Sequence, residues 1–171
     1  MCCLFGFIDY AGALSVTQKN RLIRELSIAA EVRGTDATGV AYNSSRGLQI
    51  YKRPLAAHRL QLRIPAETHV VMGHTRMTTQ GSAKKNYNNH PFFGHVKGQS
   101  FALAHNGVIW NDLELRRTKR LPRTKVQTDS FIAVQLIEQH KTLNLFSLKC
   151  MAEQVEGSFS FSVLSEQDEL W

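Results

Sequence analysis

The sequence predicts an α+β domain built on antiparallel sheets. Its short apolar segments, typical of strands, are joined by hairpin turns or stand outside any regular alternation of strand and helix, which favours antiparallel pairing. Other segments carry apolar residues at helical spacing. With 171 residues, 43% of them apolar and 20% charged, the chain can bury one hydrophobic core without disulfide or metal support.

The N-terminal segment predicts a strand followed by a helix. Residues 4–8 form a short apolar run typical of a buried strand. Ser15 and Gln18 have the spacing of a capping box, in which each side chain bonds the other residue's backbone N–H. A helix should therefore follow Ser15 and continue to about Glu31.

The next segments predict a hairpin and a short helix. Residues 39–43 and 48–52 are typical of strands, and the turn-rich residues 44–47 join them. A short helix is expected within 54–65, a segment that begins and ends with proline.

The central part of the chain predicts two strands separated by a long loop. The strand at 69–73 runs into His74-Thr75-Arg76, and the polar residues 77–91 form a loop of the length that is usually functional. Residues 100–105 form the second strand. Asn106-Gly107 then has the preferred sequence of a type I′ turn, so spacing alone favours a hairpin there.

The C-terminal part predicts two helices and a strand. Residues 128–130 are a helix N-cap candidate ahead of an apolar periodic segment, and residues 145–155 have helical spacing. Gly157 opens an alternating strand at 158–163. The chain ends at 166–171, where a hairpin should return with another strand.

The positive charge is concentrated in one segment. The formal net charge is +7, and residues 116–125 contain six cations and no acid. A solvated loop is the favoured interpretation, and an anionic partner is the alternative. Nucleic-acid binding is not supported, because no basic face interleaved with aromatics and no reader motif is visible.

Cysteine usage and hydropathy favour a cytoplasmic protein without a membrane segment. No apolar run approaches the length needed to span a bilayer, and no signal peptide is evident. The three cysteines, Cys2, Cys3 and Cys150, are too few and too oddly placed for a disulfide framework or a zinc site. Removal of Met1 would make Cys2 the N-terminal residue, with a thiol and a free α-amine.

Several polar residues have both a structural and a functional interpretation. The vicinal Cys2-Cys3 pair could be an acylation site, although no basic cluster supports it. Asp129 could be only a helix cap. Arg76 could be a surface residue, but its position after a buried strand suits a strand-end site. The favoured interpretation of three other residues is structural, and they form no convincing metal triad: His74, His90 and His105.

Taken together and in order, seven segments resemble the glutaminase domain of the class II glutamine amidotransferases, a family of N-terminal-nucleophile hydrolases. The segments are Met1-Cys2-Cys3-Leu4-Phe5-Gly6, Arg33-Gly34-Thr35-Asp36-Ala37-Thr38-Gly39, Gly73-His74-Thr75-Arg76-Met77-Thr78-Thr79-Gln80-Gly81, Asn89-His90-Pro91-Phe92, Ala104-His105-Asn106-Gly107-Val108-Ile109-Trp110-Asn111, Thr128-Asp129-Ser130 and Gly157-Ser158-Phe159.

The resemblance implies a fold and a reaction. The fold would be a four-layer αββα sandwich of antiparallel sheets, here a single domain over residues 1–171 that lacks the last strands. The reaction would be hydrolysis of the glutamine side-chain amide to glutamate and ammonia through a Cys2 thioester, with the Cys2 α-amine as base. The Asn106 side chain and the Gly107 N–H would stabilise the oxyanion. No cofactor and no metal ion are called for.

The resemblance also assigns the substrate-binding residues. Arg76 would bind the carboxylate of L-glutamine through a bidentate fork, and Asp129 would bind its ammonium. Thr79 and His90 complete the expected substrate-binding set.

Partners follow from the same resemblance. A synthetase or acceptor subunit would receive the ammonia. A sheet edge left open at the C-terminus makes a homo-oligomer conceivable.

One departure from the family pattern motivates a second hypothesis. The family has Gly where this chain has Cys3, and a side chain there could crowd the site. Together with a retained Met1 and the missing C-terminal strands, it motivates the alternative of a catalytically impaired member that acts as a glutamine-binding or protein-interaction module.

Overall fold

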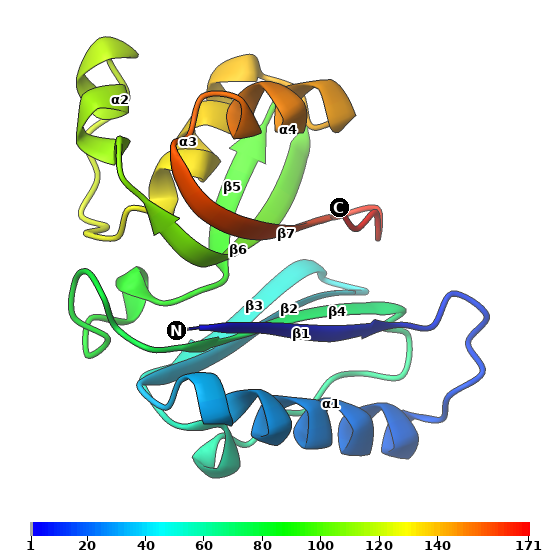
Figure 1. Ribbon diagram of the computed structural model, residues 1–171. Coiled ribbons are helices and arrows are strands. Elements are labelled where there is room, and N and C mark those ends of the chain that lie inside the picture. The colour runs from blue at the N-terminus through cyan, green and yellow to red at the C-terminus, as the bar shows by residue number, and fades with distance from the viewer. Residues whose placement is uncertain (1) are drawn as a thin grey trace.

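The chain folds into four layers, helix, sheet, sheet and helix (Figure 1). The computed structural model describes residues 2–171. The seven strands are β1 (Cys3–Ile8), β2 (Ala37–Ser44), β3 (Gly47–Arg53), β4 (Val70–Arg76), β5 (Phe92–Val96), β6 (Gln99–Ile109) and β7 (Gly157–Ser165). The four α-helices are α1 (Val16–Ala30), α2 (Asp112–Thr118), α3 (Phe131–His140) and α4 (Leu145–Ala152). The α+β prediction is confirmed.

The first sheet has the strand order β1-β4-β2-β3, and every neighbouring pair is antiparallel. Helix α1 covers its outer face (Figure 1). The predicted capping box at the start of α1 is present, with Gln18 N–H donating to Ser15 and Ser15 N–H donating to Gln18. The hairpin predicted across residues 44–47 is also confirmed, because Ser44 pairs with Gly47. The short helix expected within 54–65 is a single 3₁₀ turn at Ala57–Arg59.

The second sheet has the order β5-β6-β7, also antiparallel, and α3 and α4 cover its outer face (Figure 1). The hairpin predicted at Asn106-Gly107 is wrong. Strand β6 runs through both residues, and Gly107 pairs with Phe159 of β7. Gly107 takes a φ of 149°. Glycine can adopt a positive φ, which makes Asn-Gly common in tight turns, and here the same property is used within a strand. The hairpin lies instead at Lys97-Gly98, after the unpredicted β5.

Two further corrections concern the C-terminal half. Part of the basic segment 116–125 is helical, because α2 continues to Thr118, and the remainder is a loop. At the C-terminus the chain turns back, and the backbone of Trp171 exchanges two hydrogen bonds with Val163 beside the Leu164–Leu170 bridge. The expected return strand therefore begins within the described residues.

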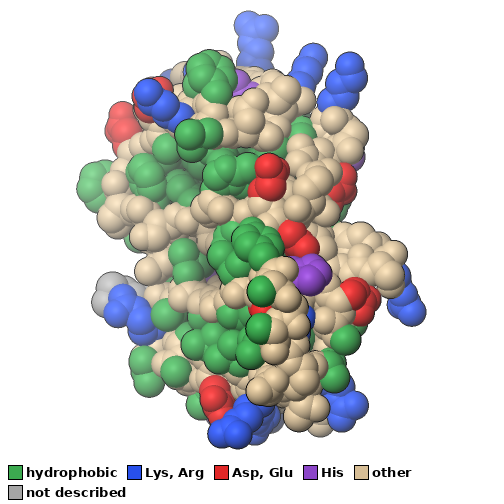
Figure 2. All heavy atoms as spheres, turned by 90° about the vertical axis from the view of Figure 1, so that its right-hand side faces the viewer, with side chains coloured by type: hydrophobic (Ala, Val, Ile, Leu, Met, Phe, Trp, Pro, Cys, Tyr) green, Lys and Arg blue, Asp and Glu red, His purple; other side chains and the backbone are tan. Residues whose placement is uncertain are grey.

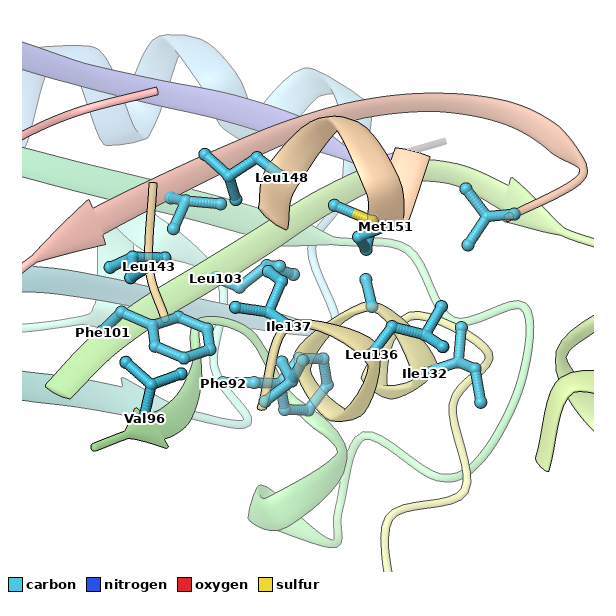
Figure 3. Packing of buried hydrophobic residues seen from close by; sticks show 14 of the residues in the cluster. Phe92, Val96, Phe101, Leu103, Ile132, Leu136, Ile137, Leu143, Leu148 and Met151 are labelled. Atoms are coloured by element: carbon cyan, nitrogen blue, oxygen red, sulfur yellow. The ribbon is translucent and has the colours of Figure 1, made fainter. Parts of the chain in front are cut away.

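Three apolar clusters fill the spaces between the four layers. Ile23 of α1 packs with Val40 and Val71 on the outer side of the first sheet. A second cluster joins the two sheets, and half of it is alanine: Ala41, Val70, Met72, Ala102, Ala104 and Leu164. The largest cluster lies between the second sheet and its helices, where Phe92, Leu103 and Leu136 are among the contributors (Figure 3). Along β4 and β6, side chains alternate between these spaces, as the period of a strand requires.

The surface is mixed in character. On the face shown in Figure 2, Lys and Arg side chains lie at the periphery and apolar side chains gather nearer the middle. An open groove of about 440 Å³ runs beside β1, between the edge strands of the two sheets, and Leu4, Phe7 and Leu170 contribute to its lining. Within residues 2–171, no helix is both long enough and apolar enough to cross a bilayer.

Candidate active site

Strand alternation brings Cys2 and Asn106 to one cavity. In β1, Phe5 and Phe7 pack on the α1 side whereas Leu4 faces the other sheet, so Cys2, two residues before Leu4, shares the face between the sheets. In β6, Ala104 faces the first sheet, and Asn106 shares its face. The cavity where the two strands meet has a volume of about 470 Å³, and its lining consists of Cys2, Thr79, Asn106, Gly107, Val108, Ser158, Phe159 and Ser160.

The Cys2 thiol is partly buried and held by backbone contacts. Its Sγ lies 3.5 Å from the carbonyl oxygen of Met77, and Arg33 Nε donates to the Cys2 carbonyl at 3.2 Å. Burial raises the pKa of the Cys2 thiol, and the positive charge of Arg76 opposes that rise. The thiol therefore stays protonated at neutral pH and needs a base to become a nucleophile. Met1, whose removal was considered above, lies outside the described residues.

Cys3 does not line the cavity. It follows Cys2 in β1 and pairs with Thr75 of β4, so its side chain takes the opposite face of the sheet, with Phe5 and Phe7. The crowding considered for a side chain at this position does not occur at the cavity.

Gly107 is placed where only glycine fits. A Cβ at this position would lie 1.9 Å from the carbonyl oxygen of Ser158 and 2.8 Å from Nε2 of His105. The φ of 149° is in addition unfavourable for any L side chain. The close approach of β7 therefore fixes the identity of this residue, and it presents bare backbone to the cavity.

Arg76 ends β4 as a buried side chain with 2% exposure. Its Nη1 donates to Asn89 Oδ1 at 2.7 Å, and its Nη2 donates to the Gln80 carbonyl. Both partners belong to the long loop that follows β4, so this loop fixes the guanidinium. Arg76 does not line the cavity, but its positive charge lowers the pKa of the Cys2 thiol and so opposes the effect of burial.

The Asp129 carboxylate does not cap α3. Its Oδ2 accepts from the backbone N–H of Ile109 at 2.7 Å, at the end of β6, and its own N–H donates to Gln80 Oε1 at 3.0 Å. Like Arg76, Asp129 is buried, does not line the cavity, and acts electrostatically on Cys2. Gln80 thus contacts both residues, one through its carbonyl and the other through its side chain.

The structure does not bring His90 to the cavity. Its ring lies in the core, 4.2 Å from the ring of His74 and 4.4 Å from that of Phe92. Neither of its ring nitrogens has a hydrogen-bond partner among the described residues. His74 Nε2 lies 3.0 Å from the carbonyl oxygen of His105 and bridges the two sheets. Within residues 2–171, no group of three or more His, Cys, Asp or Glu is arranged to hold a metal ion.

The buried histidines should make the protein sensitive to acid. Burial lowers the pKa of His74 from 6.5 to about 3 and also lowers that of His90 and His105. Between about pH 3 and 6.5, the unfolded chain therefore binds more protons than the folded chain. The free energy of unfolding is highest above about pH 6.5 and decreases as the pH falls. At about pH 4.5, His74 alone should lower the free energy of unfolding by about 3 kcal/mol relative to neutral pH.

Urea unfolding between about pH 4.5 and 7.5 measures this dependence. Replacing His74 by glutamine should reduce the slope of unfolding free energy against pH by about one proton. The neutral substitution Gln99→Ala, at a residue away from the buried histidines, is the control and should leave the slope as in the wild type. An unchanged slope for His74→Gln would contradict the prediction.

Some residues of the site carried no predicted role. Gln80 and Ser130 lie within quoted motifs, and so do Ser158 and Phe159 of β7, but the contacts that they make depend on how the strands assemble. Lys52 lies in none of these motifs, and nothing in the sequence indicated a functional role for it. It lies on β3 and donates to the carbonyl oxygens of Asn89 and Pro91. Burial lowers its pKa to about 8, and it fixes the same loop residue that orients Arg76.

Comparison with known proteins identifies relatives over almost the whole chain. A family model described as "Glutamine amidotransferases class-II" matches residues 11–143. The glutamine–fructose-6-phosphate aminotransferase (isomerizing) of Streptococcus agalactiae serotype III is 30% identical over 176 residues, which cover 98% of this chain and 28% of that protein. An enzyme of the same name from Thermus thermophilus is 29% identical over 175 residues, covering 99% and 28%.

Two solved structures share the fold at low sequence identity. One, titled as the allosteric regulatory enzyme of purine biosynthesis, has a TM-score of 0.75 at 18% identity and covers 97% of this chain and 36% of its own. The glutamine phosphoribosylpyrophosphate amidotransferase of B. subtilis, complexed with ADP and GMP, has a TM-score of 0.70 at 17% identity, with 96% and 35% covered. The chain spans roughly a quarter to a third of the length of these proteins.

Proposed function

Because the chain belongs to the class II glutamine amidotransferases, we propose that the cavity at Cys2 hydrolyses the side-chain amide of L-glutamine to glutamate and ammonia. One observation carries the proposal. Cys2, at the start of β1, and Asn106-Gly107, on β6 of the second sheet, line the same cavity. A nucleophile and a pair of hydrogen-bond donors on opposite walls are what acyl transfer requires.

The reaction begins with proton transfer from the Cys2 thiol to the α-amine of the same residue, once Met1 has been removed. An α-amine has a pKa of roughly 7.7 to 8 and can exchange protons at neutral pH. The sulfur attacks the amide carbon, and the Asn106 side chain and the Gly107 N–H stabilise the oxyanion. As the C–N bond breaks, the ammonium returns its proton to the leaving group, which departs as ammonia. Water then cleaves the thioester, releasing glutamate and restoring the thiol.

Arg76 and Asp129 select free glutamine in this proposal. Only two of the five guanidinium N–H donors of Arg76 are used in the contacts described above, and a carboxylate is the ligand that they would bind. Asp129 would attract the ammonium of the substrate, and Thr79 contributes to the cavity wall. His90 remains part of the proposed substrate-binding set, although its ring lies in the core beside His74 and Phe92.

The ammonia is proposed to pass to an acceptor site outside the described residues. The relatives from Streptococcus agalactiae and Thermus thermophilus are named as aminotransferases acting on fructose 6-phosphate, and this chain matches about 28% of each. We therefore assign the glutaminase half of an amidotransfer to this chain, with a synthetase-type acceptor domain or subunit as partner.

Glutamate release from glutamine tests the proposal. The protein is prepared by protease cleavage of an N-terminal fusion so that the chain begins with Cys2, as intact mass verifies. We expect equal release of glutamate and ammonia, and a mass adduct on Cys2 with a diazoketone analogue of glutamine. An adduct without turnover would support the alternative of an impaired glutamine-binding member. Neither adduct nor turnover would refute the proposal.

A further inference from the structure

Ser130 occupies the position of a helix cap without capping. It precedes α3 with 4% exposure, and its side chain makes no hydrogen bond to the first turn of that helix. Its Oγ lies instead 2.8 Å from Nδ1 of His105 and 3.3 Å from Oδ1 of Asp129. The hydroxyl therefore joins the residue before Asn106 to the proposed ammonium-binding carboxylate.

The chemistry of the three groups fixes the direction of these hydrogen bonds. An ionised carboxylate only accepts, so the Ser130 hydroxyl donates to Asp129. The oxygen of that hydroxyl is then the acceptor for an N–H of His105. Burial lowers the pKa of His105, opposed by the charge of Asp129 and by the Ser158 carbonyl, so the ring is neutral and carries one proton. The donation from Ser130 to Asp129 places that proton on Nδ1, and Nε2 then has no hydrogen-bond partner among the described residues.

Both ends of this hydrogen-bonded series hold the strand that carries Asn106 and Gly107. On one side, the His105 carbonyl oxygen lies 3.0 Å from Nε2 of His74 in the first sheet. On the other side, Asp129 Oδ2 accepts from the N–H of Ile109. Residues 105–109 are thus held at both ends, at His105 by His74 and at Ile109 by Asp129. Ser130 links these two ends, because its hydroxyl contacts both the His105 ring and the Asp129 carboxylate.

We infer that Ser130 is a positioning residue for the proposed amide hydrolysis, on which this inference rests. Its hydroxyl holds the Asn106-Gly107 backbone and the Asp129 carboxylate in one arrangement. Without it, Nδ1 of His105 loses its partner, and the Asp129 carboxylate keeps the Ile109 N–H but loses the contact that holds its second oxygen. Oxyanion stabilisation and substrate binding should then weaken together, which lowers kcat and raises KM in the same variant.

Ser130→Ala tests the inference against a matched control. We expect kcat/KM for glutamine to fall by roughly tenfold to a hundredfold, with both a lower kcat and a higher KM. Ser147→Ala makes the same change at a buried serine whose hydroxyl belongs to the capping box of α4. That control should lose stability but keep the wild-type KM, because partial unfolding lowers only the concentration of active protein.

Two more variants and a spectroscopic measurement complete the test. Ser130→Thr keeps the hydroxyl and should recover most of the activity, whereas Ser130→Cys keeps the size and should not. The ¹⁵N shifts of the His105 ring should show the Nδ1–H form in the wild type and lose it in Ser130→Ala and Ser130→Cys. This readout does not need turnover, so an inactive wild type would overturn the proposed function and leave the inference testable. The inference would be overturned if Ser130→Ala and Ser130→Cys kept the KM of the wild type. It would also be overturned if the ¹⁵N spectrum of His105 were unchanged in these two variants.

Discussion

Replacing Cys2 by alanine should lower glutamate release by at least ~10³-fold, because Cys2 supplies the thiol nucleophile of the proposed reaction and the hydroxyls that also line the cavity are far weaker nucleophiles. Among the cysteines, only Cys2 contributes to the cavity lining. The circular dichroism spectrum and the thermal midpoint should stay close to those of the wild type, since the thiol makes one long contact to the Met77 carbonyl. Steady-state assay of both proteins with the chain beginning at residue 2 provides the measurement.

Two other cysteines serve as controls for this variant. Cys150→Ala makes the same change on α4, and Cys3→Ala makes it on the opposite face of β1. Both should keep activity within a factor of about two, as is usual for substitutions away from a site. If Cys3→Ala abolished turnover while Cys2→Ala did not, the assignment of the nucleophile would be wrong.

Replacing Gly107 by alanine should be the most destabilising single change at the site, at about 4 kcal/mol. The new Cβ would meet the Ser158 carbonyl oxygen at 1.9 Å, and a strand backbone has no flexible end that can move aside. The residue would in addition have to keep a φ of 149°. Because β6 and β7 must separate to relieve the clash, glutamate release should be lost in the fraction that remains folded.

Gly98→Ala separates backbone strain from steric overlap. Gly98 also has a positive φ, 73°, but a Cβ there would have no heavy atom within 4 Å. This variant should lose about 1 kcal/mol, the ordinary cost of a left-handed conformation. Urea unfolding of both variants gives the comparison. Equal losses would mean that the approach of β7 to Gly107 is not the cause.

Short sequence patterns correctly predicted those elements that are stabilised by contacts between residues close together in the sequence. The Ser15–Gln18 capping box and the hairpin at residues 44–47 depend on neighbours in the sequence, and both are present. Asn106-Gly107 shows the limit of such reasoning. The dipeptide indicates tolerance of a positive φ, but only pairing with β7, about fifty residues later, decides that the tolerance is used inside a strand.

The motifs in the sequence identified the candidate residues. They could not predict which contacts these residues make in the folded protein. Cys2, Thr79, Asn106 and Gly107 line one cavity, which the sequence could only suggest by resemblance. Asp129 was a cap or a ligand on sequence grounds, and its actual partner is the N–H of Ile109. Such a contact depends on the distance between α3 and β6, which no local pattern encodes.

The alanines between the two sheets have a consequence for catalysis. Ala41, Ala102 and Ala104 lie where the sheets face each other, and facing sheets ordinarily stand about 10 Å apart. Cys2 directly precedes β1 of one sheet, and Asn106 lies on β6 of the other, only two residues beyond Ala104. Small side chains at this position let the two sheets approach closely. In the proposed reaction, the thickness of the hydrophobic interior therefore contributes to the distance between the Cys2 sulfur and the Asn106 amide.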